Sequence, residues 1–227
     1  MTTTPTTWLP PIPGLHRRDP EHRYWLGDVE FPISVTGVLS VLKSEFAMER
    51  IMSTRASWEP RGNTAHRAME LFLGLFFSPA GWNAENAHEL QQLKEGEFAD
   101  WVVPLIGHDR WPHLQVIGSE LTVACTRRRV AGTFDCAYID ENGQTVLADL
   151  KSLGSAESST YCTRAQLGGY MALLEASHGV TVPLGQTIWC RPGSTTFSPL
   201  YSRAECLLAW AGAWACWRAR HPEHGIS

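Results

Sequence analysis

Two short motifs near the middle of the chain carry residues suited to metal-dependent chemistry. A Gly-x-x-Asp over 132–135 ends on Asp135, and an Asp-x-Lys over 149–151 supplies Asp149 and Lys151. Neighbouring carboxylates repel one another unless a cation lies between them, and hard oxygen ligands suit Mg²⁺ or Mn²⁺. The two motifs therefore predict a divalent-metal site if the fold brings them together.

The turn between the two motifs decides whether their carboxylates share a face of a sheet, because strand side chains alternate with period two. A two-residue Asn-Gly turn would put Asp149 on the wrong face. A three-residue loop over 141–143 pairs Asp135 with Asp149, and Gly143 suits the left-handed position of its bulge. We expect the second register, because it collects the apolar residues on one face. These residues are Val130, Phe134, Cys136, Tyr138, Val146, Ala148 and Leu150.

The preceding strand adds a third carboxylate, Glu120. A two-residue turn at 127–128 would place Glu120 directly across from Asp135, with Cβ atoms roughly 4.5–5.5 Å apart. Arg-Arg is a poor turn sequence, so this register depends on the alternation of apolar residues. A solvated outer face with ordinary charges is the alternative for the set Glu120, Asp135, Asp149 and Lys151.

Helices on either side of these strands must complete the arrangement. A helix from about residue 61 or 62 to 77 has an apolar stripe at helical spacing and carries His66. A second helix, from about 162 to 177, carries Gln166 and Tyr170 four residues apart on one face. Periodicity alone makes His66 a surface or internally paired histidine, and the other two an ordinary polar helix edge.

The rest of the chain is expected to form further helices and strands around this core. A helix capped by Ser34 or Thr36 should run to about residue 53 with Leu39, Leu42, Phe46 and Ile51 buried. Residues 1–20, rich in Thr and Pro, should be an extended or partly disordered arm before a single domain over 21–227. The other expected elements are helices within 84–107 and over 203–220, and strands over 187–190 and 197–201.

Composition limits the functional classes. The 227 residues carry a net charge of -4 with a pI of about 6.1, which argues against a protein that coats nucleic acid non-specifically. No apolar run reaches the ~18 residues of a membrane span, and the N-terminus lacks a signal-peptide pattern. The six cysteines form no C-x-x-C pair, so reduced core residues are expected rather than a zinc site. We expect a cytoplasmic protein of a prokaryotic or phage-infected cell.

Taken in order, the motifs resemble the PD-(D/E)XK nuclease superfamily, specifically its RecB/Cas4-like exonuclease branch. That pattern is a helix histidine, Gly-x-x-Asp, Asp/Glu-x-Lys and Gln-x-x-x-Tyr, matched here by His66, 132–135, 149–151 and 166–170. The stretches 34–39 and 61–66 further resemble phage-type members and the mitochondrial genome maintenance exonuclease group. The resemblance implies an α/β restriction-endonuclease-like core, in which a mixed central sheet is flanked by helices.

The resemblance also implies an Mg²⁺- or Mn²⁺-dependent deoxyribonuclease. Its metal ligands would be His66, Asp135, Asp149 and the backbone carbonyl of Leu150, with Glu120 acting through water or on a second ion. Lys151 would position the attacking water and stabilise developing charge. DNA contacts are expected from Gln166, Tyr170, Arg61, Arg67 and Arg164.

Two departures from the family pattern affect these expectations. Phe134-Asp135 replaces the literal Pro-Asp, which is a common variation. Some relatives hold an iron–sulfur cluster on one early and three late cysteines, but no cysteine here precedes the central strands, so no cluster is expected. We expect an exonuclease that favours single-stranded DNA or frayed ends. The alternatives are an endonuclease of the same fold and a non-catalytic DNA-binding or assembly protein, for which a broken Asp-x-Lys would be typical.

Overall fold

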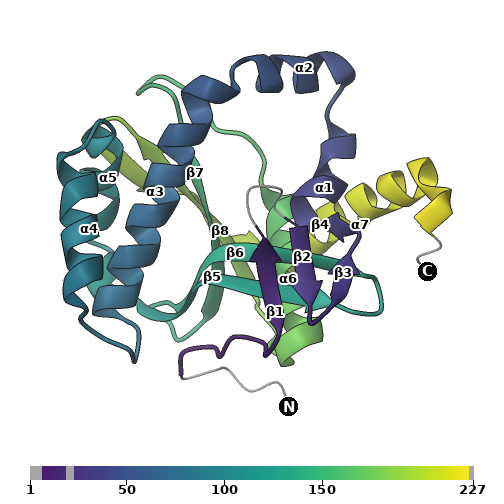
Figure 1. Cartoon of the computed structure of the whole chain (residues 1–227), viewed down its shortest axis with the longest axis horizontal. Coiled ribbons are helices and arrows are strands. Elements are labelled where there is room, and N and C mark those ends of the chain that lie inside the picture. The colour runs from purple at the N-terminus through teal and green to yellow at the C-terminus, as the bar shows by residue number, and fades with distance from the viewer. Residues whose placement is uncertain (1–6, 19–22, 225–227) are drawn as a thin grey trace.

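A mixed sheet of seven strands forms the centre of the computed structural model, which describes residues 7–18 and 23–224 (Figure 1). The strand order is β10-β8-β7-β6-β4, with β5 paired to β6 and β9 paired to β8. The strands are β4 (Ile33–Ser34), β5 (Gln115–Cys125), β6 (Val130–Ile139), β7 (Thr145–Ser152), β8 (Leu184–Arg191), β9 (Ser194–Phe197) and β10 (Tyr201–Ser202).

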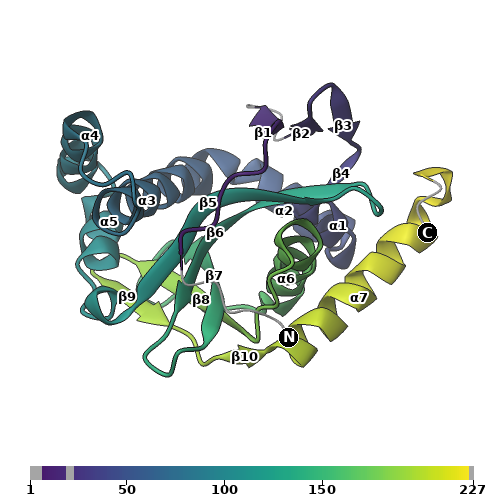
Figure 2. The ribbon, with the colours of Figure 1, turned by 90° about the horizontal axis from the view of Figure 1, so that it is seen from below.

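Helices cover both faces of this sheet (Figure 2). One face packs against α3 (Arg55–Phe76) and α5 (Ala99–Ile106), with α4 (Ala84–Glu95) outside them. The other face packs against α1 (Val35–Leu39), α6 (Arg164–His178) and α7 (Arg203–Arg220). The expected α/β class, a mixed central sheet flanked by helices, is therefore confirmed.

Both expected hairpin registers are confirmed. Strands β6 and β7 pair from Ile139 with Thr145 to Cys136 with Ala148, and Gly143 has a φ of 73°. Strands β5 and β6 meet in a turn whose closing hydrogen bond runs 3.3 Å from the Arg129 N–H to the Thr126 carbonyl. The resulting register places Glu120 opposite Asp135, because Leu121 faces Phe134 and Ser119 faces Cys136.

The prediction of a single apolar face is wrong. Val130 and Phe134 belong to the core beneath α6 and α7, whereas Cys136 and Tyr138 belong to the core beneath α3 and α5. Helices bury both faces, so neither face of β6 needs to be polar. The change of core between Phe134 and Cys136 falls at Asp135, opposite Glu120 with its φ of 46°, so the period-two alternation is interrupted there. The predicted registers are therefore correct, although the predicted distribution of apolar residues between the two faces is not.

The first predicted helix is also wrong beyond its start. Ser34 caps it as expected, accepting a 3.0 Å hydrogen bond from the Gly37 N–H, but α1 ends at Leu39. After a 3-10 turn (Ser40–Leu42), a separate helix α2 (Glu45–Ser53) buries no residue. Two expected core residues are exposed there, Leu42 by 55% and Phe46 by 75%.

The helix that carries His66 begins at Arg55, earlier than predicted, and includes Pro60. Its apolar stripe is buried at Ala65, Met69 and Leu73, but Phe76 at its end is 58% exposed. The helices predicted over 162–177 and 203–220 match α6 and α7 closely.

Part of the expected N-terminal arm packs against the domain. Leu9 is buried, and its N–H donates a 2.6 Å hydrogen bond to the Ile117 carbonyl of β5. Strand β1 (Leu15–Arg18) then forms a three-stranded sheet with β2 (Arg23–Leu26) and β3 (Val29–Phe31). Residues 1–6 and 19–20 of the expected arm lie outside the described residues. No helix among those described is both long and apolar enough to cross a membrane.

Candidate metal centre

The candidate site lies where two strands of the sheet separate. Strand β7 accompanies β6 only as far as Cys136, whereas β4 pairs with β6 at Val130 and Ala131. Asp135 lies in the gap between these partners, and β7 continues beside β8 as far as Ser152. One Asp135 oxygen, Oδ2, accepts a 2.6 Å hydrogen bond from the Leu150 N–H, which fixes the carboxylate at the fork.

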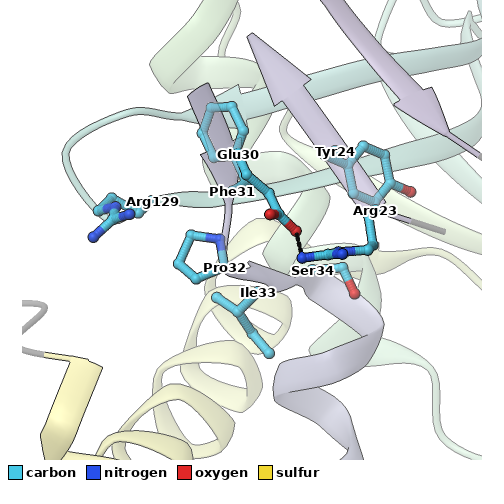
Figure 3. Close-up of a pocket in the computed structure, with 8 residues that line it drawn as sticks. All are labelled: Arg23, Tyr24, Glu30, Phe31, Pro32, Ile33, Ser34 and Arg129. Carbon is cyan, nitrogen blue, oxygen red and sulfur yellow. Dashed lines mark ion pairs between the residues drawn. The ribbon is translucent and has the colours of Figure 1, made fainter. Parts of the chain in front are cut away.

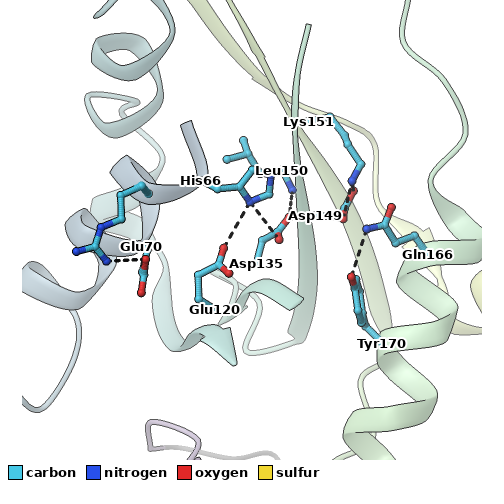
Figure 4. A network of polar contacts seen from close by, with 10 residues as sticks. His66, Glu70, Glu120, Asp135, Asp149, Leu150, Lys151, Gln166 and Tyr170 are labelled. Carbon is cyan, nitrogen blue, oxygen red and sulfur yellow. Dashed lines mark hydrogen bonds and ion pairs between the residues drawn. The ribbon is translucent and has the colours of Figure 1, made fainter. Parts of the chain in front are cut away.

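Three metal-ligating side chains from three elements meet beside this fork (Figure 4). His66 reaches down from α3, and its Nδ1 lies 3.3 Å from Asp135 Oδ1 and 3.4 Å from Glu120 Oε1. One ligand atom from each residue lies within 4.8 Å of the other two. Side-chain exposure falls from 34% at His66 to 19% at Glu120 and 8% at Asp135, so the cluster opens on the histidine side.

The backbone of Glu120 is strained. Its φ of 46° lies in the left-handed region, which a residue with a side chain adopts at a cost of about 1–3 kcal/mol. Such outliers concentrate at functional sites, where neighbouring structure holds them. Here the strained residue is the one that places a second carboxylate against His66.

The two carboxylates of this cluster already stabilise a positive charge, that of protonated His66. Burial disfavours a charged His66, but Asp135 and Glu120 outweigh it and raise the pKa of His66 to about 10. Burial raises the pKa of Glu120, and His66 only partly offsets this. For Asp135 the effect of burial is overcome by His66, Lys151 and the Leu150 N–H, so its pKa is lowered. A protonated imidazole thus occupies the position between two carboxylates.

The Asp-x-Lys motif forms a separate, more buried pair on β7. Lys151 Nζ lies 3.1 Å from Asp149 Oδ1 and 2.9 Å from Oδ2, and only the first contact is aligned as a hydrogen bond. Asp149 is 1% exposed, and burial raises its pKa to about 6 despite Lys151. Burial opposes protonation of Lys151, but Asp149 and Asp135 raise its pKa above the usual value.

These residues fit a divalent cation. One imidazole nitrogen and carboxylate oxygens are ligands that divalent metal ions use in proteins. Asp149 Oδ2 lies 2.9 Å from Lys151 Nζ without the alignment of a hydrogen bond, so it is the Asp149 oxygen that a cation would share with the ammonium. His66, Glu120 and Asp135 would hold the ion as they stand, whereas Asp149 would join only by sharing its carboxylate with Lys151. Ligation by the Leu150 carbonyl stays a prediction.

Gln166 and Tyr170 lie on α6 on the other side of the fork (Figure 4). Gln166 Nε2 donates a 3.4 Å hydrogen bond to the Tyr170 hydroxyl. The Tyr170 ring is 5% exposed, and a Cβ on Gly132 would come within 2.8 Å of it, so Gly132 leaves room for the ring. Burial and the nearby Asp135 and Asp149 raise the pKa of Tyr170, which keeps its hydroxyl protonated. Only the polar end of this pair is placed to meet a substrate.

The three predicted phosphate-binding arginines differ in their partners. Arg67 is held by Glu89 at 2.7 Å and Glu70 at 2.8 Å. Arg164 lies 3.5 Å from Glu205 and donates to the Cys162 thiol. Arg61 has no carboxylate within ion-pair distance among the described residues, so it is the best placed of the three to bind a phosphate.

A polar cavity of about 430 Å³ lies elsewhere, between the small sheet and β4 (Figure 3). Its lining includes an ion pair between Arg23 and Glu30, together with Arg129. The described residues that line it hold no grouping of metal-ligating side chains comparable to the fork. We therefore place the candidate chemistry at the fork.

Sequence reasoning missed Tyr161 and Arg191 near the site. Tyr161 is 54% exposed, and its ring lies 5.1 Å from that of Trp189, the parallel-strand partner of Lys151. Both residues lie outside the recognised motifs: Arg191 is brought near Lys151 by the β7–β8 pairing, and Tyr161 by its ring contact with Trp189. The strained φ of Glu120 likewise has no signature in the sequence.

Comparisons with known proteins add little to this geometry. No protein-family model matches the chain, and no curated protein matches it. A solved structure described as "Crystal structure of SSO0001" aligns over 82% of this chain and 76% of that chain, with 11% identity and a TM-score of 0.32. A likeness this weak carries no argument about fold or function.

Proposed function

We propose that this protein is an Mg²⁺- or Mn²⁺-dependent deoxyribonuclease, and specifically an exonuclease that favours single-stranded DNA or frayed ends. The observation that carries the proposal is the juxtaposition of His66, Glu120 and Asp135, with ligand atoms within 4.8 Å of one another, beside the Asp149–Lys151 pair. The family resemblance of the motifs is consistent with this chemistry.

A bound divalent ion would supply the polarisation of the scissile phosphate and a lowered pKa for a coordinated water. His66 would give up its proton to serve as a ligand, since a metal binds neutral imidazole. Lys151 keeps its charge and provides a fixed ammonium next to the carboxylates, where it can orient a water and stabilise negative charge on the phosphate. Asp149 holds that ammonium in place.

The preference for single strands follows from charge and shape. The chain has a net charge of -4, so it lacks the overall positive field that grips a duplex. The fork also draws its residues from α3, β5, β6 and β7, which surround the site on several sides (Figure 4). A flexible single strand enters such a site more readily than a rigid duplex.

The test is digestion of end-labelled single-stranded, blunt and frayed DNA with Mg²⁺, Mn²⁺ or EDTA. Short products released from ends of the single-stranded and frayed substrates, only with metal, are the expected result. Nicks in a closed circular plasmid would identify an endonuclease instead. Absence of hydrolysis with every metal, in protein that is folded and binds DNA, would favour a non-catalytic DNA-binding protein.

A further inference from the structure

A second basic site lies beyond Lys151, at the end of β7. There the loop 153–158 crosses the strand ends, held by a 2.8 Å hydrogen bond from the Trp101 Nε1–H to the Leu153 carbonyl. Within the loop, the Ser155 N–H donates a 3.0 Å hydrogen bond to Ser158 Oγ, so the loop has a defined shape. Two arginines from distant parts of the chain approach it.

Arg61 approaches the loop from α3. Its guanidinium lies over the Trp101 ring at 5.6 Å, and a Cβ on Gly154 would lie 3.9 Å from both terminal nitrogens. Arg191 approaches from β8, and its Nη2 donates a 3.1 Å hydrogen bond to the Ser158 carbonyl. The two cationic groups therefore flank one short loop.

Neither arginine is neutralised by the protein. Their hydrogen-bond acceptors are neutral: the Ser57 carbonyl for Arg61, and the Ser158 carbonyl and Thr196 hydroxyl for Arg191. The Nε atom of each is buried without a hydrogen-bond partner. Among the described residues no carboxylate, including Glu157 of the same loop, lies within 4.0 Å of either guanidinium. A half-buried cation pair without a counterion favours binding of an anion.

The arginine pair lies close enough to Lys151 for one DNA strand to contact both. Lys151 pairs with Trp189, and Arg191 follows two residues later, or about 7 Å at ~3.3 Å per residue. Gly62, next to Arg61, lies close to Ser152, since an added Cβ would be 3.6 Å from the serine hydroxyl. Tyr161 lies with its exposed ring against Trp189, the strand partner of Lys151 and two residues before Arg191.

We propose that Arg61 and Arg191 bind the backbone phosphate next to the scissile one in single-stranded DNA, and that Tyr161 stacks on the adjoining base. The inference rests on the proposed function for the identity of the scissile phosphate. Arginine suits this role because its planar fork binds two phosphate oxygens at once. An aromatic ring accepts any base, so the site would bind without sequence preference.

The test measures binding of a fluorescent single-stranded oligonucleotide in EDTA, where no cleavage occurs. Arg61→Ala and Arg191→Ala should each weaken binding about tenfold. The double variant Arg61→Ala/Arg191→Ala should lower the slope of log affinity against log salt by about 0.7, the value for one lost phosphate contact, and each single variant should lower it by less. Arg55→Ala is the matched control, because Arg55 lies on the same helix but is paired with Glu59 at 2.6 Å. Arg61→Lys and Arg191→Lys, which keep the charge, should fall between wild type and alanine.

The phosphate is located by replacing single phosphates with uncharged methylphosphonates along the oligonucleotide. One replacement, next to the cleavage position found with metal, should weaken binding most for wild type, less for Arg61→Ala, and not at all for the double variant Arg61→Ala/Arg191→Ala. Tyr161→Leu should weaken binding about tenfold, except when the adjoining base is removed, whereas Tyr161→Phe should bind as wild type.

The outcomes separate this inference from the proposed function. If wild type cleaves DNA but the folded arginine variants bind it within twofold of wild type with an unchanged salt slope, the subsite is wrong and the nuclease stands. If the variants lose affinity as expected but no metal supports cleavage, the arginine site stands and the nuclease is wrong. If wild type binds no single-stranded DNA in EDTA but cleaves it with metal, the subsite is wrong and the nuclease stands; if wild type neither binds nor cleaves it, both are overturned.

Discussion

The two halves of the candidate site, one beside α3 and one on β7, compensate their buried carboxylates in different ways. On the α3 side, His66 lies between two carboxylates and is one third exposed, so its proton can be exchanged for another cation. On the β7 side, Asp149 is almost fully buried, and Lys151 is its fixed partner. The first half is a place where a metal can enter, and the second keeps a permanent positive charge beside it. Substitutions on the α3 side should therefore affect metal affinity most, and substitution of Lys151 should affect cleavage most.

The largest effect is expected at Asp135, which both halves share. Asp135→Asn removes the charge that His66 and a metal both need, and weakens the acceptor of the Leu150 N–H. Metal affinity should fall at least about 100-fold, beyond the loss typical of a ligand's supporting residue, and cleavage should be undetectable. Calorimetric titration with Mn²⁺ measures this, with Asp109→Asn, a fully exposed aspartate, as the control. Unchanged Mn²⁺ affinity would remove Asp135 from the metal site.

Lys151→Ala should impair cleavage of DNA without preventing the binding of DNA or metal. Loss of the ammonium should reduce cleavage by about 10²–10³-fold while DNA and metal still bind, because the lysine acts on the water and the transition state. It also leaves Asp149 as a buried unpaired charge, so added metal should raise the Tm of the variant more than that of wild type. Single-turnover cleavage and thermal melting measure both effects, with Lys94→Ala on α4 as the control. Near-normal cleavage by Lys151→Ala would refute the assigned role. Asp149→Ala, which removes the partner of the ammonium, should also lose cleavage, but with a smaller loss of metal affinity than Asp135→Asn.

The pH dependence should reverse when metal is added. In EDTA, protonated His66 has a folded pKa of about 10 against about 6.5 unfolded, so its stabilisation is complete below pH 6.5 and declines as the pH rises toward 10. With Mn²⁺ the ion must displace that proton, so the metal-induced rise in Tm should grow with pH. Melting curves from pH 6.5 to 8.5 test this. His66→Gln should remove both trends, whereas His88→Gln on α4 should keep them; a wild-type metal shift independent of pH would contradict the prediction.

The smallest effect concerns the strained backbone of Glu120. In the metal-free protein Glu120→Gly should be about 1 kcal/mol more stable than Glu120→Ala, because both lose the ion pair with His66 but only glycine adopts positive φ without strain. Both should bind metal more weakly. Urea unfolding measures the difference, and equal stability of the two variants would show that the φ of 46° carries no strain.

The hairpins illustrate how far local rules determine structure. The β6–β7 register is predicted correctly from Gly143, the loop length and the apolar alternation. In the β5–β6 hairpin, the hydrogen bond from the Arg129 N–H to the Thr126 carbonyl closes the predicted turn. Helices α6 and α7 followed from their periodicity. Local rules failed between the end of α1 and α2, where Leu42 of the 3-10 turn and Phe46 of α2 have helical spacing but no surface to pack against. The spacing of apolar residues predicts an amphipathic helix, but it does not predict whether another element packs against the apolar face.

The sequence by itself determined which residues are chemically capable and the order of strands and helices that carries them, because turn chemistry and side-chain period act over a few residues. Only the tertiary structure decided that His66 contacts Asp135 and Glu120 rather than solvent, and that Arg67 is neutralised while Arg61 is not. It also decided that β6 and β7 separate at Cys136 and that Arg191 and Tyr161 lie near Lys151. These relations depend on how helices pack over both faces of the sheet, and such packing joins residues that are distant in sequence.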